Sequence, residues 1–161
     1  MNFANGRGLA RRLACLAAMA TIACGREQST TSSTQPLTEF PYATARPDCA
    51  PWDGPAVGIL FAVTADTAEA AARPYIYVGL YDTRDRLLGR TVRWPAEPVL
   101  GGASLCSVDG NCSAADSGVV TLDALESDSV IPGRLRLVIP GRPALEGTFR
   151  AVWRPRIAMC G

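Results

Sequence analysis

Catalytic chemistry in this chain is limited first by two residue types that it lacks. The sequence contains no His and no Lys, so its 16 basic residues are all Arg. Without His there is no side chain that titrates near neutrality and no imidazole ligand, and without Lys there is no Schiff-base chemistry. Paired carboxylates remain, as in glycoside hydrolysis, and both candidate pairs lie in turn-like stretches where acids are normally solvated. These pairs are Asp82 with Asp85 and Glu126 with Asp128, and we expect neither to be catalytic.

Metal-ligating residues are also sparse. Asp109, Asn111 and Asp116 put oxygen ligands on a Gly-containing loop, which is how calcium sites begin, but the calcium-loop pattern is absent. Zinc sites built from thiolates need cysteine pairs with two residues between them, and the chain has no such pair. We therefore expect no metal and no other cofactor.

The cysteines are the most informative residues, and the first question is what happens at Cys24. Arg7, Arg11 and Arg12 precede an apolar run over residues 13–23. A run of this length is too short to span a bilayer, but it fits the apolar region of an export signal. Residues 1–23 are therefore predicted to be a signal peptide.

The segment Thr21-Ile22-Ala23-Cys24 resembles the bacterial lipobox, in which a small residue precedes the cysteine that is lipidated. Ala23 matches the small residue, Gly25 is a common follower, and Thr21 stands where the family prefers Leu. The resemblance implies an exported lipoprotein of the cell envelope, anchored in a membrane through Cys24 and facing the periplasm or lying in the outer membrane of a diderm cell. The alternative is a soluble secreted protein, which would keep an odd number of cysteines.

Four cysteines remain for disulfides if Cys24 is lipidated and Cys15 is removed with the signal. An even set is what an exported disulfide protein needs, and four cysteines allow three connectivities. One pair encloses a short turn containing Asp-Gly-Asn, and the other brackets the whole folded region, whose ends should lie close together. The predicted pairs are Cys106 with Cys112 and Cys49 with Cys160.

The rest of the chain divides into a linker and a domain. Residues 24–46 contain the run QSTTSSTQP and are predicted to be a flexible linker, while residues 47–161 show short apolar runs separated by turn residues. This pattern predicts an all-β domain, an antiparallel β-sandwich or small β-barrel. Residues 75–81 and 86–94 are expected to form a hairpin, and residues 65–73 are the one helix candidate. The other expected strands cover residues 55–64, 118–125, 133–139 and 144–153.

The C-terminal strands resemble the closing meander of many uncharacterised bacterial lipoproteins. That family carries a Gly-x-Val strand, a Gly-led strand, a Gly-x-Phe strand and a final cysteine. The resemblance implies β architecture and an exported setting, and no activity comes with it. The matching positions here are Gly118, Val120, Gly133, Gly147, Phe149 and Cys160.

One stripe of aromatic residues could bind a ligand. Tyr75, Tyr77 and Tyr81 alternate with apolar residues, so they share one face of a strand, and Trp94 is expected nearby on the next strand. Such a face could stack a sugar or another flat ligand, but strands also use aromatics for half-buried faces and cross-strand pairs. Trp52 is expected to fill the core or its edge.

Charge and composition then limit the classes of function that we expect. From Cys24 onward the chain has 13 Arg against 15 Asp and Glu, a formal charge of −2, so we expect no nucleic-acid partner. The function that we expect is non-catalytic, either structural in the envelope or through interaction with another envelope protein. The alternative is a small-ligand binding module, for example for a carbohydrate, that uses the tyrosine face.

Overall fold

The computed structural model describes residues 33–65, 73–96, 98–127 and 129–161. They form ten strands, a short α-helix and one 3-10 turn, so the prediction of an all-β fold is confirmed. The elements are β1 (Thr34–Pro36), η1 (Leu37–Glu39), β2 (Tyr42–Cys49), β3 (Pro55–Ala62), β4 (Tyr75–Leu80), α1 (Arg84–Leu87), β5 (Thr91–Trp94), β6 (Gly101–Cys106), β7 (Cys112–Ala114), β8 (Ser117–Leu122), β9 (Val130–Val138) and β10 (Ala144–Trp153).

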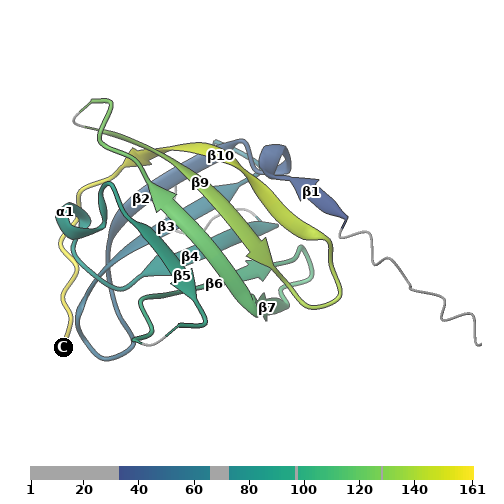
Figure 1. Ribbon diagram of the computed structural model, residues 1–161, viewed down its shortest axis with the longest axis horizontal. Coiled ribbons are helices and arrows are strands. Elements are labelled where there is room, and N and C mark those ends of the chain that lie inside the picture. Colours follow the sequence, from purple (N-terminus) through teal and green to yellow (C-terminus); the bar gives the residue numbers. More distant parts are fainter. Residues whose placement is uncertain (1–32, 66–72, 97, 128) are drawn as a thin grey trace, which may run out of the picture. The chain divides into compact units, whose positions relative to one another are not determined.

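All ten strands belong to one sheet, which folds over on itself. The hydrogen-bonded order is β5-β8-β9-β10-β2-β3-β4-β6-β7, with β1 added to β10. In Figure 1, β5, β8 and β9 form a front layer and β2, β3, β4 and β6 lie behind it. We call these the front layer and the back layer; β10 connects them, because it pairs with β9 along one edge and with β1 and β2 along the other.

The core lies between the two layers and follows the alternation of the strands. β10 matches the expected range of residues 144–153, and its Leu145 and Phe149 are buried while Arg150 points out. Phe149 packs edge-on against Phe61 of β3, with ring centroids 5.0 Å apart. This contact joins the front half of the sheet to the back half.

Two pairings in the sheet are parallel, which the alternation of residues did not predict. β1 and β2 both run parallel to β10, whereas the other pairings are antiparallel. Period-two patterning reports which face a residue takes and carries no information about the direction of the neighbouring strand. The all-β class is therefore right, and the sheet is mixed.

The predicted hairpin between residues 75–81 and 86–94 is wrong. β4 pairs with β3 and β6, β5 pairs with β8, and α1 lies between them. The helical turn forms because it buries Leu87 in the core. A strand could bury Leu87 as well, so the sequence does not distinguish the two conformations.

The predicted boundary at residue 47 is also wrong, because the folded domain includes much of the expected linker. β1, η1 and most of β2 fall within residues 24–46, and Leu37 and Phe40 are buried in the core. Because the segment is mostly polar, its sequence did not indicate that these two side chains are buried. The remainder of the linker up to residue 32, the export signal with Cys24, and residues 66–72 of the helix candidate lie outside the described residues.

The two disulfides are the predicted ones. Cys49 is bonded to Cys160 with a Cα–Cα distance of 5.5 Å, and Cys106 is bonded to Cys112 at 4.0 Å. The first ties the C-terminal tail to the end of β2, and the second closes the turn between β6 and β7. In the part of the chain that the structure describes, no helix has the length and apolarity needed to cross a membrane.

Candidate functional site

The three tyrosines lie on the outer surface of the back layer, on the face that the alternation predicted. Tyr75 and Tyr77 project outward from β4, opposite to the buried Ile76 and Val78, and all three rings are half-buried. They have no partner from β5, because the hairpin that would bring it there does not form. The surroundings of the rings therefore come from β2, β3 and β6.

A row of glycines runs across this surface beneath the tyrosines. Register places Arg46 opposite Gly58, Gly58 opposite Gly79, and Gly79 opposite Gly102, so one cross-strand row has three positions without side chains. The missing side chains leave a shallow trough across β3, β4 and β6. We call this row the glycine trough.

Tyr77 fills one end of the glycine trough. Its ring leans across Gly58 and its hydroxyl donates a short hydrogen bond to the Asp48 carboxylate on β2. A Cβ at Gly58 would come within 2.7 Å of the Tyr77 hydroxyl, so only glycine leaves room for this contact. Burial, followed by the hydrogen bond and the negative charge of Asp48, raises the pKa of Tyr77 above its ordinary value. Tyr77 is therefore a neutral, fixed donor at physiological pH.

Tyr81 fills the other end of the trough. A Cβ at Gly79 would lie 3.1 Å from the Tyr81 ring, and one at Gly102 would lie 3.2 Å from its hydroxyl. The outer edge of the ring meets Trp52 in a T-shaped contact, with centroids 5.1 Å apart. Aromatic rings that cover glycines in this way support the sheet from outside. Their packing gives the tyrosine face a structural role, while ligand binding there remains a prediction.

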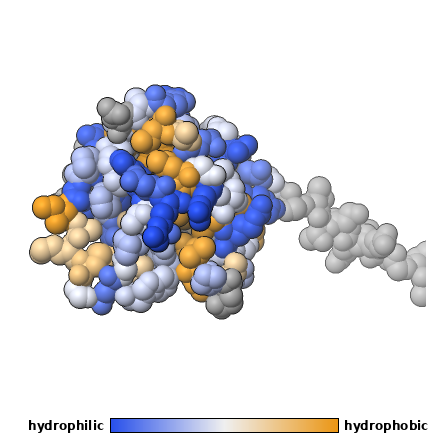
Figure 2. All heavy atoms as spheres, turned by 60° about the vertical axis from the view of Figure 1, so that its left-hand side comes forward, coloured by the Kyte–Doolittle hydropathy of each residue, from blue (hydrophilic) through white to orange (hydrophobic). Residues whose placement is uncertain are grey.

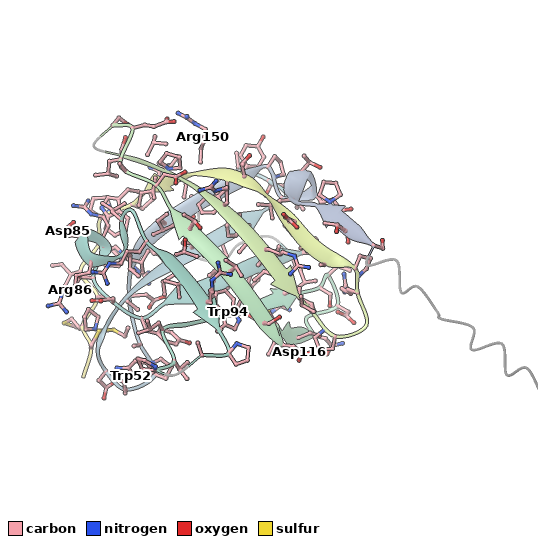
Figure 3. All side chains as sticks on the ribbon, in the orientation of Figure 1. Trp52, Asp85, Arg86, Trp94, Asp116 and Arg150 are labelled. Atoms are coloured by element: carbon pink, nitrogen blue, oxygen red, sulfur yellow. A yellow bond between two sulfur atoms is a disulfide. The ribbon has the colours of Figure 1, made fainter. Side chains whose placement is uncertain are left out.

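Trp94 is placed differently from what we expected, and Trp52 lies at the edge of the domain and outside its core. Trp94 does not join the tyrosine face: it is buried between the layers, beneath β8, where its ring occupies the space over Gly118 (Figure 3). Its Nε1 meets no hydrogen-bond partner among the described residues. Trp52 does not fill the core, because 57% of its surface is exposed. The structure therefore buries the Trp94 indole and exposes most of Trp52.

Exposed apolar residues gather around Trp52 at one end of the sheet. The backbone N–H of Tyr81 donates to the Leu100 carbonyl at 2.8 Å, and the Cys49–Cys160 bond brings Met159 to the same end. Leu100 is 41% and Met159 90% exposed. Figure 2 turns the side that carries α1 toward the viewer and shows apolar residues between charged ones. We call Trp52, Tyr81, Val99, Leu100 and Met159 the apolar tip.

The carboxylates considered for catalysis are engaged in local contacts. Asp82 accepts a bond from the Thr83 amide and lies 3.8 Å from Arg86, while Asp85 contacts Arg84 at 3.0 Å. Glu126 forms an ion pair with Arg150. Asp128 lies outside the described residues, so the second pair is not placed in full. Each of the three described acids is held by its own turn or by a neighbouring strand.

The acidic turn considered for calcium is likewise closed on itself. Asp109 accepts hydrogen bonds from the Ser107 hydroxyl and from the backbone and side chain of Asn111. These bonds, led by the one from Ser107, lower the pKa of Asp109. Among the residues that the structure describes, no three His, Cys, Asp or Glu side chains come together as metal ligands would.

Comparison with known proteins gives no relative: no family model, no curated protein and no solved structure matches this chain. The site must therefore be judged on its geometry. The sequence did not indicate the roles of Asp48 and Gly58 or the contact of Trp52 with Tyr81, since these depend on which strands are neighbours. In residues 133–139, Arg134 and Arg136 alternate with leucines, so the sequence itself puts the two arginines on one face of a strand. It does not show which residues of other strands lie beside them.

Proposed function

We propose that this protein is an exported, lipid-anchored β-domain that acts by binding another protein of the cell envelope and has no catalytic role. The signal-like segment and the lipobox resemblance at Cys24 support the anchor. The two disulfides support an oxidising compartment outside the cytoplasm. The observation that carries the binding role is the exposed apolar tip.

The composition of the tip favours a protein partner. Trp and Tyr are enriched at the centres of protein interfaces, where a few such residues supply most of the binding free energy. Trp52 is mostly exposed, yet its ring is held in place by Tyr81. A preorganised aromatic residue loses little conformational entropy on binding, so it is a favourable anchor.

The tip lies at the opposite end of the domain from the N-terminal strand β1. β10 pairs with β1 at Ala144, opposite Thr34, and with β2 at Ala151, opposite Ala43. The path from Thr34 to Cys49, at the end of β2, therefore covers seven positions along β10 and then six positions along β2. At about 3.3 Å per residue this offset is roughly 40 Å along the strands. The chain between Cys24 and Thr34 spans at most about 35 Å even when fully extended. The tip therefore lies at the end of the domain that is far from the point where the chain enters it.

Site-specific photo-crosslinking in intact cells tests this function. A photoreactive residue at Trp52 should give one discrete adduct with an exported envelope protein, and the same residue at the exposed Val108 should not. The purified partner should then bind the Trp52→Ala protein at least about 10-fold more weakly than the wild type, as expected for an interface anchor. Adducts with lipid alone, or equal adducts at both positions, would refute the proposal.

A second measurement tests the anchor separately. The wild-type protein should incorporate a fatty-acid label and partition into detergent, and Cys24→Ser should abolish the label. A multiply acylated cysteine is a stable anchor, whereas one chain gives only marginal membrane binding. Membrane association that is unchanged in the Cys24→Ser protein would contradict the lipid anchor without bearing on the tip.

A further inference from the structure

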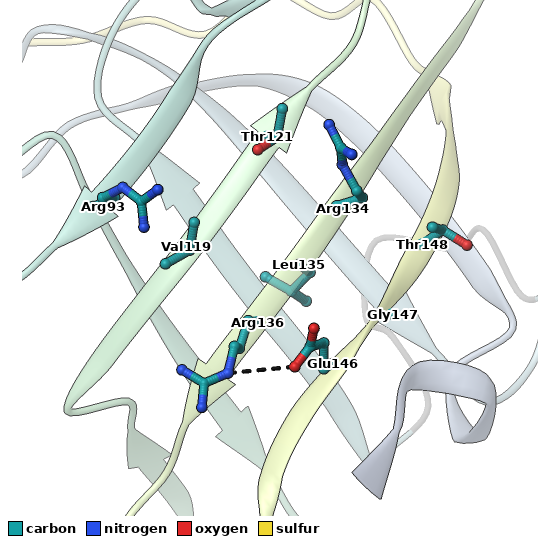
Figure 4. A pocket seen from close by; sticks show the side chains of 9 residues that line it. All are labelled: Arg93, Val119, Thr121, Arg134, Leu135, Arg136, Glu146, Gly147 and Thr148. Carbon is teal, nitrogen blue, oxygen red and sulfur yellow. Dashed lines mark ion pairs between the residues drawn. The ribbon is translucent and has the colours of Figure 1, made fainter. Parts of the chain in front are cut away.

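A hollow with an arginine lining lies on the outer surface of the front layer, on the opposite side of the sheet from the core. Its volume is about 440 Å³, within the size range of small-ligand sites. Figure 4 shows three guanidinium groups from two strands around this hollow. The lining residues are Arg93, Val119, Thr121, Arg134, Leu135, Arg136, Glu146, Gly147 and Thr148.

Strand register explains how the arginines come together. Arg93 lies opposite Val119, which lies opposite Arg136, so two strand spacings separate these arginines. Arg134 is two residues from Arg136 on β9 and projects from the same face. Strand geometry puts the Cα atoms of the three arginines roughly 7 to 12 Å apart. Long side chains on such a triangle can converge on one anionic group.

The positive charge of the hollow is only partly neutralised. Glu146 is its one lining carboxylate, and it contacts Arg136 through Nε at 3.3 Å, which leaves both terminal nitrogens outside that contact. Arg134 has a long contact of 3.8 Å with Asp123. Among the described residues, no carboxylate lies within 4.0 Å of the Arg93 guanidinium. Three arginines against one glutamate give the lining a formal charge of +2, although the chain from Cys24 onward is negative.

The hollow lies at the end of the sheet where the chain enters the domain. Glu146 on its rim is directly opposite Pro36 of β1, and Gly147 and Thr148 follow on β10. Pro36 comes only twelve positions after Cys24, a stretch that spans at most about 40 Å. An anchor at Cys24 would keep this face within reach of the bilayer surface.

We propose that this hollow binds the phosphate-bearing headgroup of an anionic lipid in the membrane that holds the anchor. The nearness of the membrane rests on the proposed lipid anchor, while the binding chemistry rests on the hollow alone. Arginine matches phosphate oxygens with two parallel hydrogen bonds, and the Thr121 and Thr148 hydroxyls can bond the polar remainder of a headgroup. Binding would orient the domain with this face toward the lipid.

Vesicle flotation tests the proposal without the anchor. The protein is the processed chain from residue 24 with Cys24→Ser, and the probes are vesicles of pure phosphatidylcholine or with about a third phosphatidylglycerol. We expect flotation only with phosphatidylglycerol, and weaker flotation at high salt. The double variant Arg93→Gln with Arg136→Gln should bind on the order of 20-fold more weakly, since each arginine near an anionic surface contributes roughly a factor of five.

A matched control separates a site from a general charge effect. Arg86 is exposed on α1, away from the hollow, and Arg86→Gln removes one positive charge per chain (Figure 3). Arg86→Gln and the single variant Arg93→Gln therefore differ only in where the charge is lost. Retained binding with Arg86→Gln and loss with Arg93→Gln supports the proposal, and circular dichroism confirms that both variants are folded.

Three results would overturn the proposal. They are equal flotation with phosphatidylcholine vesicles, equal losses with Arg86→Gln and Arg93→Gln, and full displacement from phosphatidylglycerol vesicles by low millimolar inorganic phosphate at constant ionic strength. The last result would assign the hollow to soluble phosphate compounds in place of lipid. None of these outcomes depends on acylation or on a protein bound to the tip, so failure here is distinct from failure of the proposed function.

Discussion

Replacing Gly147 by Val should release the N-terminal segment from the sheet. Gly147 lies on β10 with its open side toward Leu37 of η1, and a Cβ built on Gly147 would lie 2.6 Å from the Cβ of Leu37. In the structure Gly147 is the place where η1 approaches the strand closely enough to bury Leu37, which is 4% exposed.

The size of the effect follows from what Leu37 loses. Full burial of a leucine stabilises a fold by about 2 to 3 kcal/mol, and Val in place of Gly in a strand returns up to about 1 kcal/mol. Gly147→Val should therefore cost about 1 to 2 kcal/mol. Leu37→Ala alone should cost about 2 to 3 kcal/mol, the lower part of the range for core truncations, because Leu37 lies at the edge of the core.

The double variant makes the test decisive, because both changes break the same contact. If Gly147→Val already displaces η1, then Leu37→Ala should add less than about 0.5 kcal/mol in that background, a coupling of about 2 kcal/mol. Urea denaturation followed by tryptophan fluorescence measures all three unfolding free energies. Thr148→Val is the control on the outward face of the same strand and should change stability by less than about 0.5 kcal/mol. Additive costs would refute the docking of η1 on Gly147.

Three further predictions concern the core, the tyrosine face and the disulfide. Phe149→Ala should cost about 3 to 5 kcal/mol by urea denaturation because the ring is buried against β3, whereas Arg150→Ala should cost less than about 1 kcal/mol because its ion pair is exposed; equal costs would contradict the orientation of β10. The raised pKa of Tyr77 means that its protonated form stabilises the fold fully below about pH 10 and progressively less above it. The unfolding free energy of the wild type should therefore fall relative to that of Tyr77→Phe above pH 10, and parallel curves would refute the Asp48 contact. Replacing Cys49 and Cys160 together by Ser should cost about 4 to 5 kcal/mol in the chain-entropy model, and an unchanged melting temperature would show that the tail adds no restraint.

Long strands with regular alternation could be predicted from the sequence, and β10 matches its expected residues. β2 was missed because Arg-Pro-Asp reads as a loop, yet Pro47 pairs within the sheet opposite Val57. The parallel pairings of β1 and β2 with β10 are long-range and leave no local signal. The disulfides could be inferred without the fold, because one joins cysteines that are close in the sequence and the other joins the two ends of the domain.

The candidate sites depend on register, which the sequence does not display. The glycine trough needs Gly58, Gly79 and Gly102 in one row, and these residues come from three strands. The arginine hollow combines β9 with Arg93 of β5, a strand that the expected hairpin would have paired with β4 in place of β8. An error in one strand pairing therefore moves a charged residue to the wrong layer of the domain.

The parallel pairing of β1 with β10 determines how the domain would respond to mechanical force. A pull on the chain before Thr34 acts along the axis of β1, so it loads the backbone hydrogen bonds to Ala144–Glu146 in shear, all together, and does not open them one after another. β2, the next strand in the chain, is also parallel to β10 and forms a second shear clamp behind the first. The Cys49–Cys160 bond fixes the far end of β2 to the C-terminus, so the strand cannot be drawn past it. β1 would therefore be the first part of the domain to yield when the chain before Thr34 is pulled.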